Sequence, residues 1–258
     1  PNTISVGKLF GTIVVVVDDQ NFEVTRFRKD GEYKDGRRPE KVEYSNPEED
    51  AKRRDFTVNA LFYDITNDQI IDYVDGIADI EQGRLRFVGD ALSRIREDKL
   101  RIMRGIRFVG QLGFELEQSA FDAIKSYSYA LPQVSQERIT DEFKKILFSK
   151  KPIQALSVFE SAGLFSVVFT ELNQIWEKSV AGGNETIYRD PFTMSKLMVN
   201  AAKPFGNHIF SMASFFTPFA FWLKEMKQMK SWNSYFMSLK YSKAEAARME
   251  NFMRHLNS

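Results

Sequence analysis

Residues 93–110, SRIREDKLRIMRGIRFVG, decide the fold of this chain. On a helix of 3.6 residues per turn, one drifting stripe carries a carboxylate and three guanidinium groups: Asp98, Arg101, Arg104 and Arg107. Solvated helices usually alternate charge signs and include lysine. An arginine next to apolar surface usually donates hydrogen bonds to a carboxylate, a phosphate or the edge of a base. The stretch therefore fits either a structural ion-pair ladder or a site for phosphates or base edges.

From residue 93 onward, apolar periodicity predicts an almost wholly helical chain. The expected helices cover residues 93–110, 119–131, 135–147, 153–162 and 242–256. Gly113 and Gly163 stand where helices are expected to end. The phenylalanine, tryptophan and methionine residues between positions 205 and 237 indicate core rather than a binding surface.

Before residue 93, the pattern predicts short strands with little helix. Residues 4–28 are expected to form a β-hairpin, because β-branched and aromatic runs flank a polar turn. Asn46 and Pro47 predict the start of a helix that ends near Arg53, with acidic residues in its first turn. Residues 56–64 and 70–74 are expected to be strands. A boundary near residues 86–92 separates this β-rich head from the helical array.

Composition excludes several classes of protein. The chain has 258 residues with 43% hydrophobic content, enough for a sizeable core. Its 36 basic and 35 acidic residues leave a net charge of +1, so any basic surface must be local. It contains no cysteine, which excludes disulfides and thiolate metal sites. No long apolar run or signal peptide is present, so we expect a cytoplasmic protein with no membrane partner.

Several segments, taken in order, carry a family resemblance. They include FEVTRFR at 22–28, DGRRP at 35–39, RRDFTVNAL at 53–61 and the arginine-rich stretch at 93–110. The set resembles the class II tRNA nucleotidyltransferases and bacterial poly(A) polymerases over roughly residues 1–150. The resemblance implies an α+β fold with a partial nucleotidyltransferase head at 1–88. A helical neck with a base template at 89–148 and a helical, RNA-binding body at 149–258 would follow.

The resemblance also implies roles for single residues in the head. Arg54 would hold nucleotide phosphates, which suit the guanidinium fork. Asp55 and Asn59 would read the ribose hydroxyls. Glu23 would be a catalytic, metal-binding carboxylate, although its position by itself indicates a solvated strand residue.

Base selection is assigned by the resemblance to the arginine-rich stretch. Asp98 would accept a hydrogen bond from the exocyclic amine that cytosine and adenine share, and Arg101 would donate to the neighbouring ring acceptor. Guanine or uracil would leave a buried group unpaired, at a cost of about 1–3 kcal/mol per group. Arg104 and Arg107 fall where the family contacts the nucleotide or orders the template.

Two further segments acquire an expected role in the same way. The loop with Asp35, Gly36 and Arg37 resembles the flexible element needed for the switch from C to A addition. Glu137 and Arg138 match a helix-cap motif that stabilises the template region.

The family's first motif, a glycine-rich turn followed by an Asp-x-Asp pair, does not occur in this sequence. Two-metal phosphoryl transfer uses those carboxylates, and neither Asp18 and Asp19 nor Asp72 and Asp75 stand in a suitable context. We therefore expect Mg²⁺ to be held mainly by residues outside this chain. The first residue is not methionine, which favours part of a larger enzyme over a remnant that only binds RNA or nucleotide.

The predicted function is template-independent addition of CCA, or of its terminal A, to tRNA 3′ ends from CTP and ATP. Three alternatives stay open: a bacterial poly(A) polymerase, an A-adding enzyme and a non-catalytic RNA-binding module. The polymerase is less favoured because GKLF at 7–10 departs from the basic Gly-Arg-Arg-Phe stretch common there. Lysines and arginines of the helical part, as candidates for phosphate contacts, include Lys144, Lys145, Lys150, Lys151, Lys224, Lys227 and Lys230. Scattered solvated lysines are the usual explanation for such residues.

Overall fold

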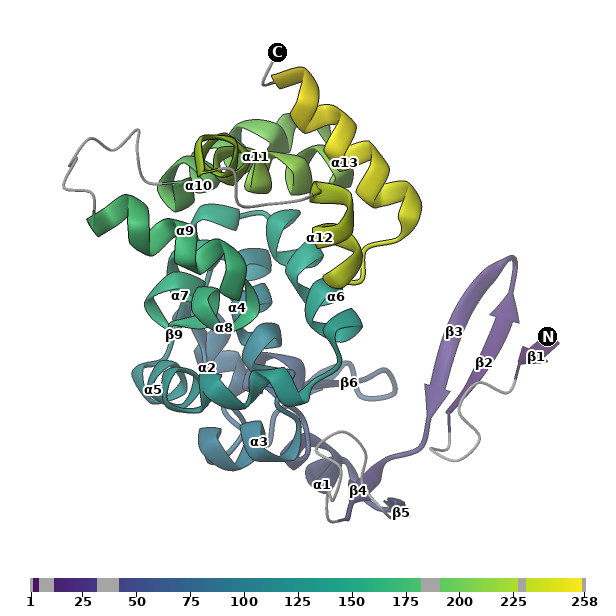
Figure 1. The fold of residues 1–258 in the computed structure, drawn as a ribbon. Coiled ribbons are helices and arrows are strands. Elements are labelled where there is room, and N and C mark those ends of the chain that lie inside the picture. Colours follow the sequence, from purple (N-terminus) through teal and green to yellow (C-terminus); the bar gives the residue numbers. More distant parts are fainter. Residues whose placement is uncertain (1, 5–11, 32–41, 182–190, 227–230, 257–258) are drawn as a thin grey trace. The chain divides into compact units, whose positions relative to one another are not determined.

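The computed structural model describes residues 2–4, 12–31, 42–181, 191–226 and 231–256. The chain divides into two compact units, Pro1–Asp98 and Lys99–Ser258. Short strands are concentrated in the first unit and the second is almost entirely helical (Figure 1). The predicted α+β fold class is confirmed. The three-part division at residues 88 and 148 stays a prediction.

The first unit alternates short strands with short helices. Its elements are β1 Asn2–Ile4, β2 Thr12–Val17, β3 Gln20–Thr25, β4 Arg28–Asp30, β5 Val42–Tyr44, α1 Pro47–Lys52, η2 Thr57–Asn59, β6 Phe62–Asp64, β7 Gln69–Ile71, α2 Gly76–Glu81, β8 Arg84–Leu85 and α3 Ala91–Glu97. Antiparallel pairing joins β1 to β2, β2 to β3, β4 to β5 and β6 to β7. The predicted hairpin is confirmed as β2–β3, with Asp18 and Asp19 at positive φ in its turn.

The strand predicted over residues 56–64 is wrong in its first half. Thr57–Asn59 form the 3₁₀ turn η2, and only Phe62–Asp64 are extended as β6. The Thr57 N–H donates to the Arg86 carbonyl at 3.0 Å, and its hydroxyl donates to Asp79 at 2.6 Å. These tertiary bonds replace the ladder that a continuous strand would make. The strand predicted over 70–74 is shorter, Gln69–Ile71.

Close packing around η2 explains why residue 76 is a glycine. A Cβ built on Gly76, at the start of α2, would lie 2.4 Å from the Thr57 carbonyl oxygen. A side chain at this position would therefore push α2 away from η2. A small apolar core lies in the same unit; its members are Ala51, Ala60 and Val88, with Phe62 and Val74 packed against them.

The single helix predicted over residues 93–110 is wrong, because two helices cover this stretch. The first, α3, ends at Glu97, and Asp98 has an extended backbone with φ −142° and ψ 106°. The second, α4, begins at Arg101 and ends at Leu112. Asp98 therefore does not continue the arginine stripe of α4. The expected stop at Gly113 is confirmed, with φ of 73°.

The second unit is a helical array. Its elements are α4 Arg101–Leu112, β9 Glu115–Leu116, α5 Gln118–Tyr127, η3 Ser128–Gln133, α6 Gln136–Leu147, α7 Pro152–Ser161, α8 Leu164–Val168, α9 Thr170–Ala181, α10 Pro191–Ala202, η5 Lys203–Phe205, α11 His208–Met226, α12 Trp232–Ser238 and α13 Lys243–Leu256. Helix α4 packs against α6 and α7, and α11 packs against α10 and α13 (Figure 1). The predicted helices over 135–147, 153–162 and 242–256 are confirmed. The helix predicted over 119–131 ends at Tyr127 and continues as η3.

Phenylalanine side chains fill the core of this second unit. Of those that the structure describes, nine are at most 2% exposed: Phe143, Phe159, Phe165, Phe169, Phe192, Phe215, Phe216, Phe219 and Phe236. The expectation of core between residues 205 and 237 holds for the three on α11 and for Phe236 on α12, whereas Phe205 is 70% exposed. Within the described residues, no helix is both long and apolar enough to cross a membrane.

Candidate nucleotide-binding site

The two arginines of the RRD motif converge on one buried carboxylate. The Asp50 side chain, on α1, is fully buried and accepts hydrogen bonds from Arg53 Nε at 2.9 Å and Arg54 Nε at 3.0 Å. Burial alone would raise the pKa of Asp50, but the Arg53 hydrogen bond and the charges of Arg53 and Arg54 outweigh it. The pKa therefore lies below its usual value, and the carboxylate is ionised at neutral pH.

The predicted ribose-reading residues lie next to this cluster in the sequence and contact each other. Asp55 Oδ1 accepts from Asn59 Nδ2 at 3.2 Å and from the Phe56 N–H at 2.9 Å. The Asp55 carbonyl accepts from the Val88 N–H at 3.1 Å. The η2 turn, which the strand prediction missed, places Asn59 beside Asp55. A helical turn is needed because residues four apart do not meet along a strand.

A second buried carboxylate lies on α2 of the same unit. Asp79 accepts from Thr57 Oγ1 at 2.6 Å, Arg84 Nε at 2.6 Å and Arg86 Nε at 3.0 Å. Burial would raise its pKa, but the Thr57 and Arg84 hydrogen bonds and the arginine charges hold the pKa below the usual value. Asp79 ties η2, α2 and β8 together, and so supports the turn that carries Asn59.

The two residues predicted to form the base template belong to different units. Asp98 is half-buried at the end of α3, in the first unit. Arg101, at the start of α4 in the second unit, is 7% exposed. Both are partly or wholly withdrawn from solvent, as base-reading groups require.

Arg107 has a structural partner that the sequence analysis missed. Its Nε lies 3.2 Å from Oε2 of Glu142 on α6, whose side chain is buried. Its guanidinium also lies 4.4 Å from the centre of the Phe108 ring. The ion-pair interpretation of the arginine stripe therefore applies to Arg107. Periodicity could not have revealed Glu142, because the pair is 35 residues apart and depends on the packing of α4 against α6.

The structure describes some of the other predicted residues. Glu23, on β3, is exposed and opposite Val14 in the strand register. Asp35, Gly36 and Arg37 lie outside the described residues. Glu137, in the first turn of α6, lies 3.8 Å from the Lys240 ammonium.

The described residues do not form a metal site by themselves. Among them, no group of three or more histidine or acidic side chains could hold an ion together. Glu23 can supply one carboxylate, and Mg²⁺ bound to phosphates commonly takes one or two from the protein. A two-metal centre needs more ligands than the one carboxylate that Glu23 offers.

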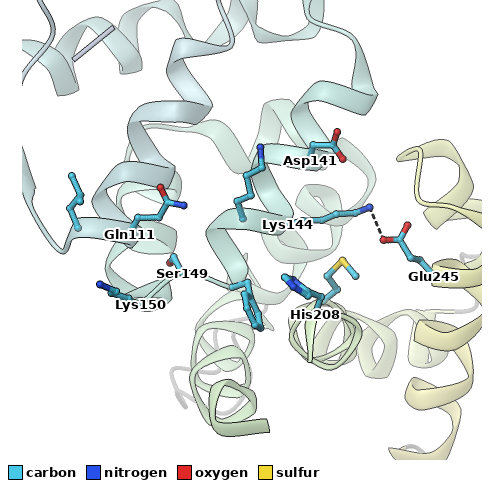
Figure 2. A pocket seen from close by; sticks show the side chains of 11 residues that line it. Gln111, Asp141, Lys144, Ser149, Lys150, His208 and Glu245 are labelled. Atoms are coloured by element: carbon cyan, nitrogen blue, oxygen red, sulfur yellow. Dashed lines mark hydrogen bonds and ion pairs between the residues drawn. The ribbon is translucent and has the colours of Figure 1, made fainter. Parts of the chain in front are cut away.

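The second unit has a cavity of about 790 Å³ between α4, α6, α11 and α13 (Figure 2). Three of the lysines considered as RNA contacts line it: Lys144, Lys145 and Lys150. Lys144 forms an ion pair with Glu245 at 2.8 Å, and Lys145 forms one with Glu142 at 3.0 Å. These acidic partners balance much of the positive charge.

Comparisons with known proteins match both the head and the helical part of this chain. Residues 1–86 match the family "Poly A polymerase head domain", and residues 113–175 match "Probable RNA and SrmB-binding site of polymerase A". A CCA-adding enzyme of Enterococcus faecalis is 43% identical over 177 residues, covering 68% of this chain and 41% of that protein. A CCA-adding enzyme of Streptococcus sanguinis is 48% identical over 158 residues, covering 60% of this chain and 39% of that protein.

A solved structure gives the same result for the fold. The Bacillus stearothermophilus CCA-adding enzyme in complex with CTP has a TM-score of 0.63 and 30% identity, covering 96% of this chain and 63% of that chain. The chain belongs to the family of class II tRNA nucleotidyltransferases and bacterial poly(A) polymerases. It spans 39–45% of the length of the curated relatives it matches.

Proposed function

We propose that this chain carries the nucleotide-selecting part of a tRNA nucleotidyltransferase. The enzyme adds CCA, or its terminal A, to tRNA 3′ ends from CTP and ATP, without a nucleic-acid template. The observation that carries the proposal is the arrangement around Asp50 and Asp55. Arg54, which is 41% exposed, follows α1 directly, and Asp55 accepts a hydrogen bond from Asn59 of η2. The relatives described above are named CCA-adding enzymes, which supports the proposal; we place the activity in the cytoplasm.

Each group has a role that its chemistry supports. Arg54 binds the phosphates of the incoming nucleotide, since its guanidinium offers donors to phosphate oxygens. Asp55 and Asn59 bind the ribose hydroxyls. Asp98 and Arg101 present an acceptor and a donor to the edge shared by cytosine and adenine. Glu23 would supply one carboxylate toward Mg²⁺, and the chemistry that such an ion would contribute is activation of the attacking hydroxyl and neutralisation of phosphate charge.

The RNA is held by the helical unit. The match of residues 113–175 to an RNA-binding family supports this assignment. The lysines that line the cavity of Figure 2 are candidates for phosphate contacts, although two of them already have acidic partners. Their contribution is expected to weaken as salt concentration rises.

The test is nucleotide incorporation by the full product of the gene that encodes this chain. It is supplied with Mg²⁺, labelled CTP or ATP, and tRNA that ends before the CCA sequence, after CC or after CCA. Ordered addition of C, C and A is expected. Addition of A to the CC-ended tRNA alone would identify an A-adding enzyme, and long A tails would identify a poly(A) polymerase. Absence of incorporation with intact RNA binding would contradict an enzymatic function.

A further inference from the structure

Asp50 holds three separate donors at one point of the first unit. Besides the two arginine side chains, its Oδ1 accepts from the Arg28 backbone N–H on β4 at 3.2 Å. The Arg53 side chain also donates to the Arg28 carbonyl at 3.2 Å. One carboxylate therefore links α1 to the strand β4 and to both arginines of the RRD motif. None of the sequence motifs had assigned a role to Asp50 beyond the charge of a helix first turn.

The local sequence explains why the link forms. Asn46 caps α1 by accepting from the Glu49 N–H at 2.9 Å, and Arg53 closes the helix with φ −86° and ψ −10°. Asp50 is three residues before Arg53 and four before Arg54, and both spacings place side chains on the same helical face. The cap and the spacing together direct both guanidinium groups onto Asp50.

This geometry leaves Arg54 with one edge held and the other available. Asp50 Oδ2 receives both Nε, at 3.0 Å, and Nη2, at 2.9 Å, so the guanidinium plane is fixed on that side. The side chain is nonetheless 41% exposed, and the Phe62 ring centre lies 6.0 Å from its central carbon. Two guanidinium charges against one carboxylate leave the cluster positive, so it still attracts phosphate.

We propose that Asp50 is a positioning residue for nucleotide binding, acting through Arg54. The inference rests on the proposed function, in which Arg54 binds the nucleotide phosphates. A free arginine side chain loses rotamer entropy when it binds a ligand, whereas a held one has already lost it. Asp50 therefore aligns the outer edge of Arg54 before the nucleotide arrives.

A purely structural role for Asp50 makes a different prediction. In that case Asp50→Asn would lower stability, and its effect on nucleotide affinity would not depend on residue 54. Asp79→Asn is a matched control, because Asp79 is equally buried in the same unit and also binds two arginines. The comparison separates loss of a buried carboxylate from loss of Arg54 alignment.

The experiment is a double-mutant cycle for CTP affinity, measured by isothermal titration calorimetry on the full chain. Asp50→Asn is expected to raise the Kd of CTP about tenfold, and Arg54→Gln at least as much. In the Arg54→Gln background, Asp50→Asn should change the Kd by less than about twofold, because coupled residues are not additive. Asp79→Asn acts on the η2 turn and not on Arg54, so it should change the Kd by the same factor in the wild-type and Arg54→Gln backgrounds.

Two contrary results are distinguishable. If Arg54→Gln binds CTP as tightly as the wild type, the phosphate role of Arg54 is wrong and the positioning role of Asp50 falls with it. If Arg54→Gln weakens binding but Asp50→Asn has no effect, or the same effect in both backgrounds, only the positioning role is wrong. Should Asp50→Asn fail to fold, Asp50→Glu keeps the charge, displaces the carboxylate by one methylene and enters the same cycle. The order parameter of Arg54 Nε, measured by nuclear magnetic resonance, adds a readout without ligand. It is expected to fall in both Asp50→Asn and Asp50→Glu.

Discussion

Asp50 and Asp79 are two fully buried carboxylates in one small unit, and each binds two arginines. The arginines of Asp50 are adjacent in the sequence at the end of α1, and Asp55, the first residue of the proposed ribose pair, follows them directly. Those of Asp79 alternate along the chain at 84 and 86, and the carboxylate also accepts from Thr57. Similar ion pairs can therefore serve different purposes. Asp50 orients the Arg54 side chain, whereas Asp79 links η2, α2 and β8.

The largest effect is expected when the Asp79 carboxylate, which links η2, α2 and β8, is removed. Asp79→Ala leaves Arg84, Arg86 and the Thr57 hydroxyl without their acceptor, and should lower the free energy of unfolding by about 3–5 kcal/mol. Urea unfolding monitored by circular dichroism measures this loss. A decrease below about 1 kcal/mol would show that solvent replaces the carboxylate easily and that Asp79 does not hold the turn.

The next effect separates two arginines that share one acceptor. Arg54→Gln should raise the Kd of CTP about tenfold, which corresponds to about 1.4 kcal/mol. Arg53→Gln should leave the Kd almost unchanged and lower stability instead, because the Arg53 side chain is only 17% exposed and binds the β4 backbone. Equal effects of the two substitutions on CTP binding would remove the distinction between them.

A smaller effect is expected from the cap of the helix that carries Asp50. Asn46→Ala removes the bond to the Glu49 N–H and should cost about 1 kcal/mol of stability with a measurable rise in the Kd of CTP. Asn207→Ala removes a comparable hydrogen bond at the start of α11, where Asn207 accepts from the Ile209 N–H at 2.9 Å. It should lower the thermal midpoint similarly without changing CTP affinity, because α11 carries none of the proposed nucleotide-binding residues. A change in affinity in both variants would point to general loosening of the fold.

The smallest effect is expected in how stability depends on pH, and it concerns both carboxylates. Each has a lowered pKa in the folded chain, and an unfolded aspartate titrates near about 3.9. The unfolded state therefore takes up protons first as pH falls, and the stability that each ion contributes above this value is lost below it. Thermal unfolding between about pH 7 and pH 3 should show a weaker dependence in Asp50→Asn and Asp79→Asn than in the wild type. Parallel curves would assign acid sensitivity to other groups.

Several features of the fold could be predicted because their causes are local. The β2–β3 hairpin, the Asn46 cap and the Gly113 stop each depend on residues within one or two turns. The break at Asp98 was missed because the spacing of Ile95, Ile102 and Ile106 in the sequence continues the helical period across it. Periodicity does not register a break of that length.

The candidate site shows the same division. The motif order predicted Asp55 and Asn59 as a pair, and the structure brings them into contact. The spacing of Asp50 before Arg54 was visible, but burial of the carboxylate and its bond to β4 were not. The Arg107–Glu142 pair was also hidden, since it depends on two helices that pack across a distant stretch of chain.

The sequence by itself determined the fold class, the family, and the donors and acceptors available to a nucleotide, because these follow from residue type and short-range spacing. Only the tertiary structure decided which of the arginines are held and by what. Ion pairs such as Arg107–Glu142 join residues from different helices, and a carboxylate such as Asp50 becomes a strong partner only when packing removes it from water. Burial and proximity are properties of the assembled core, so no local pattern of residues encodes them.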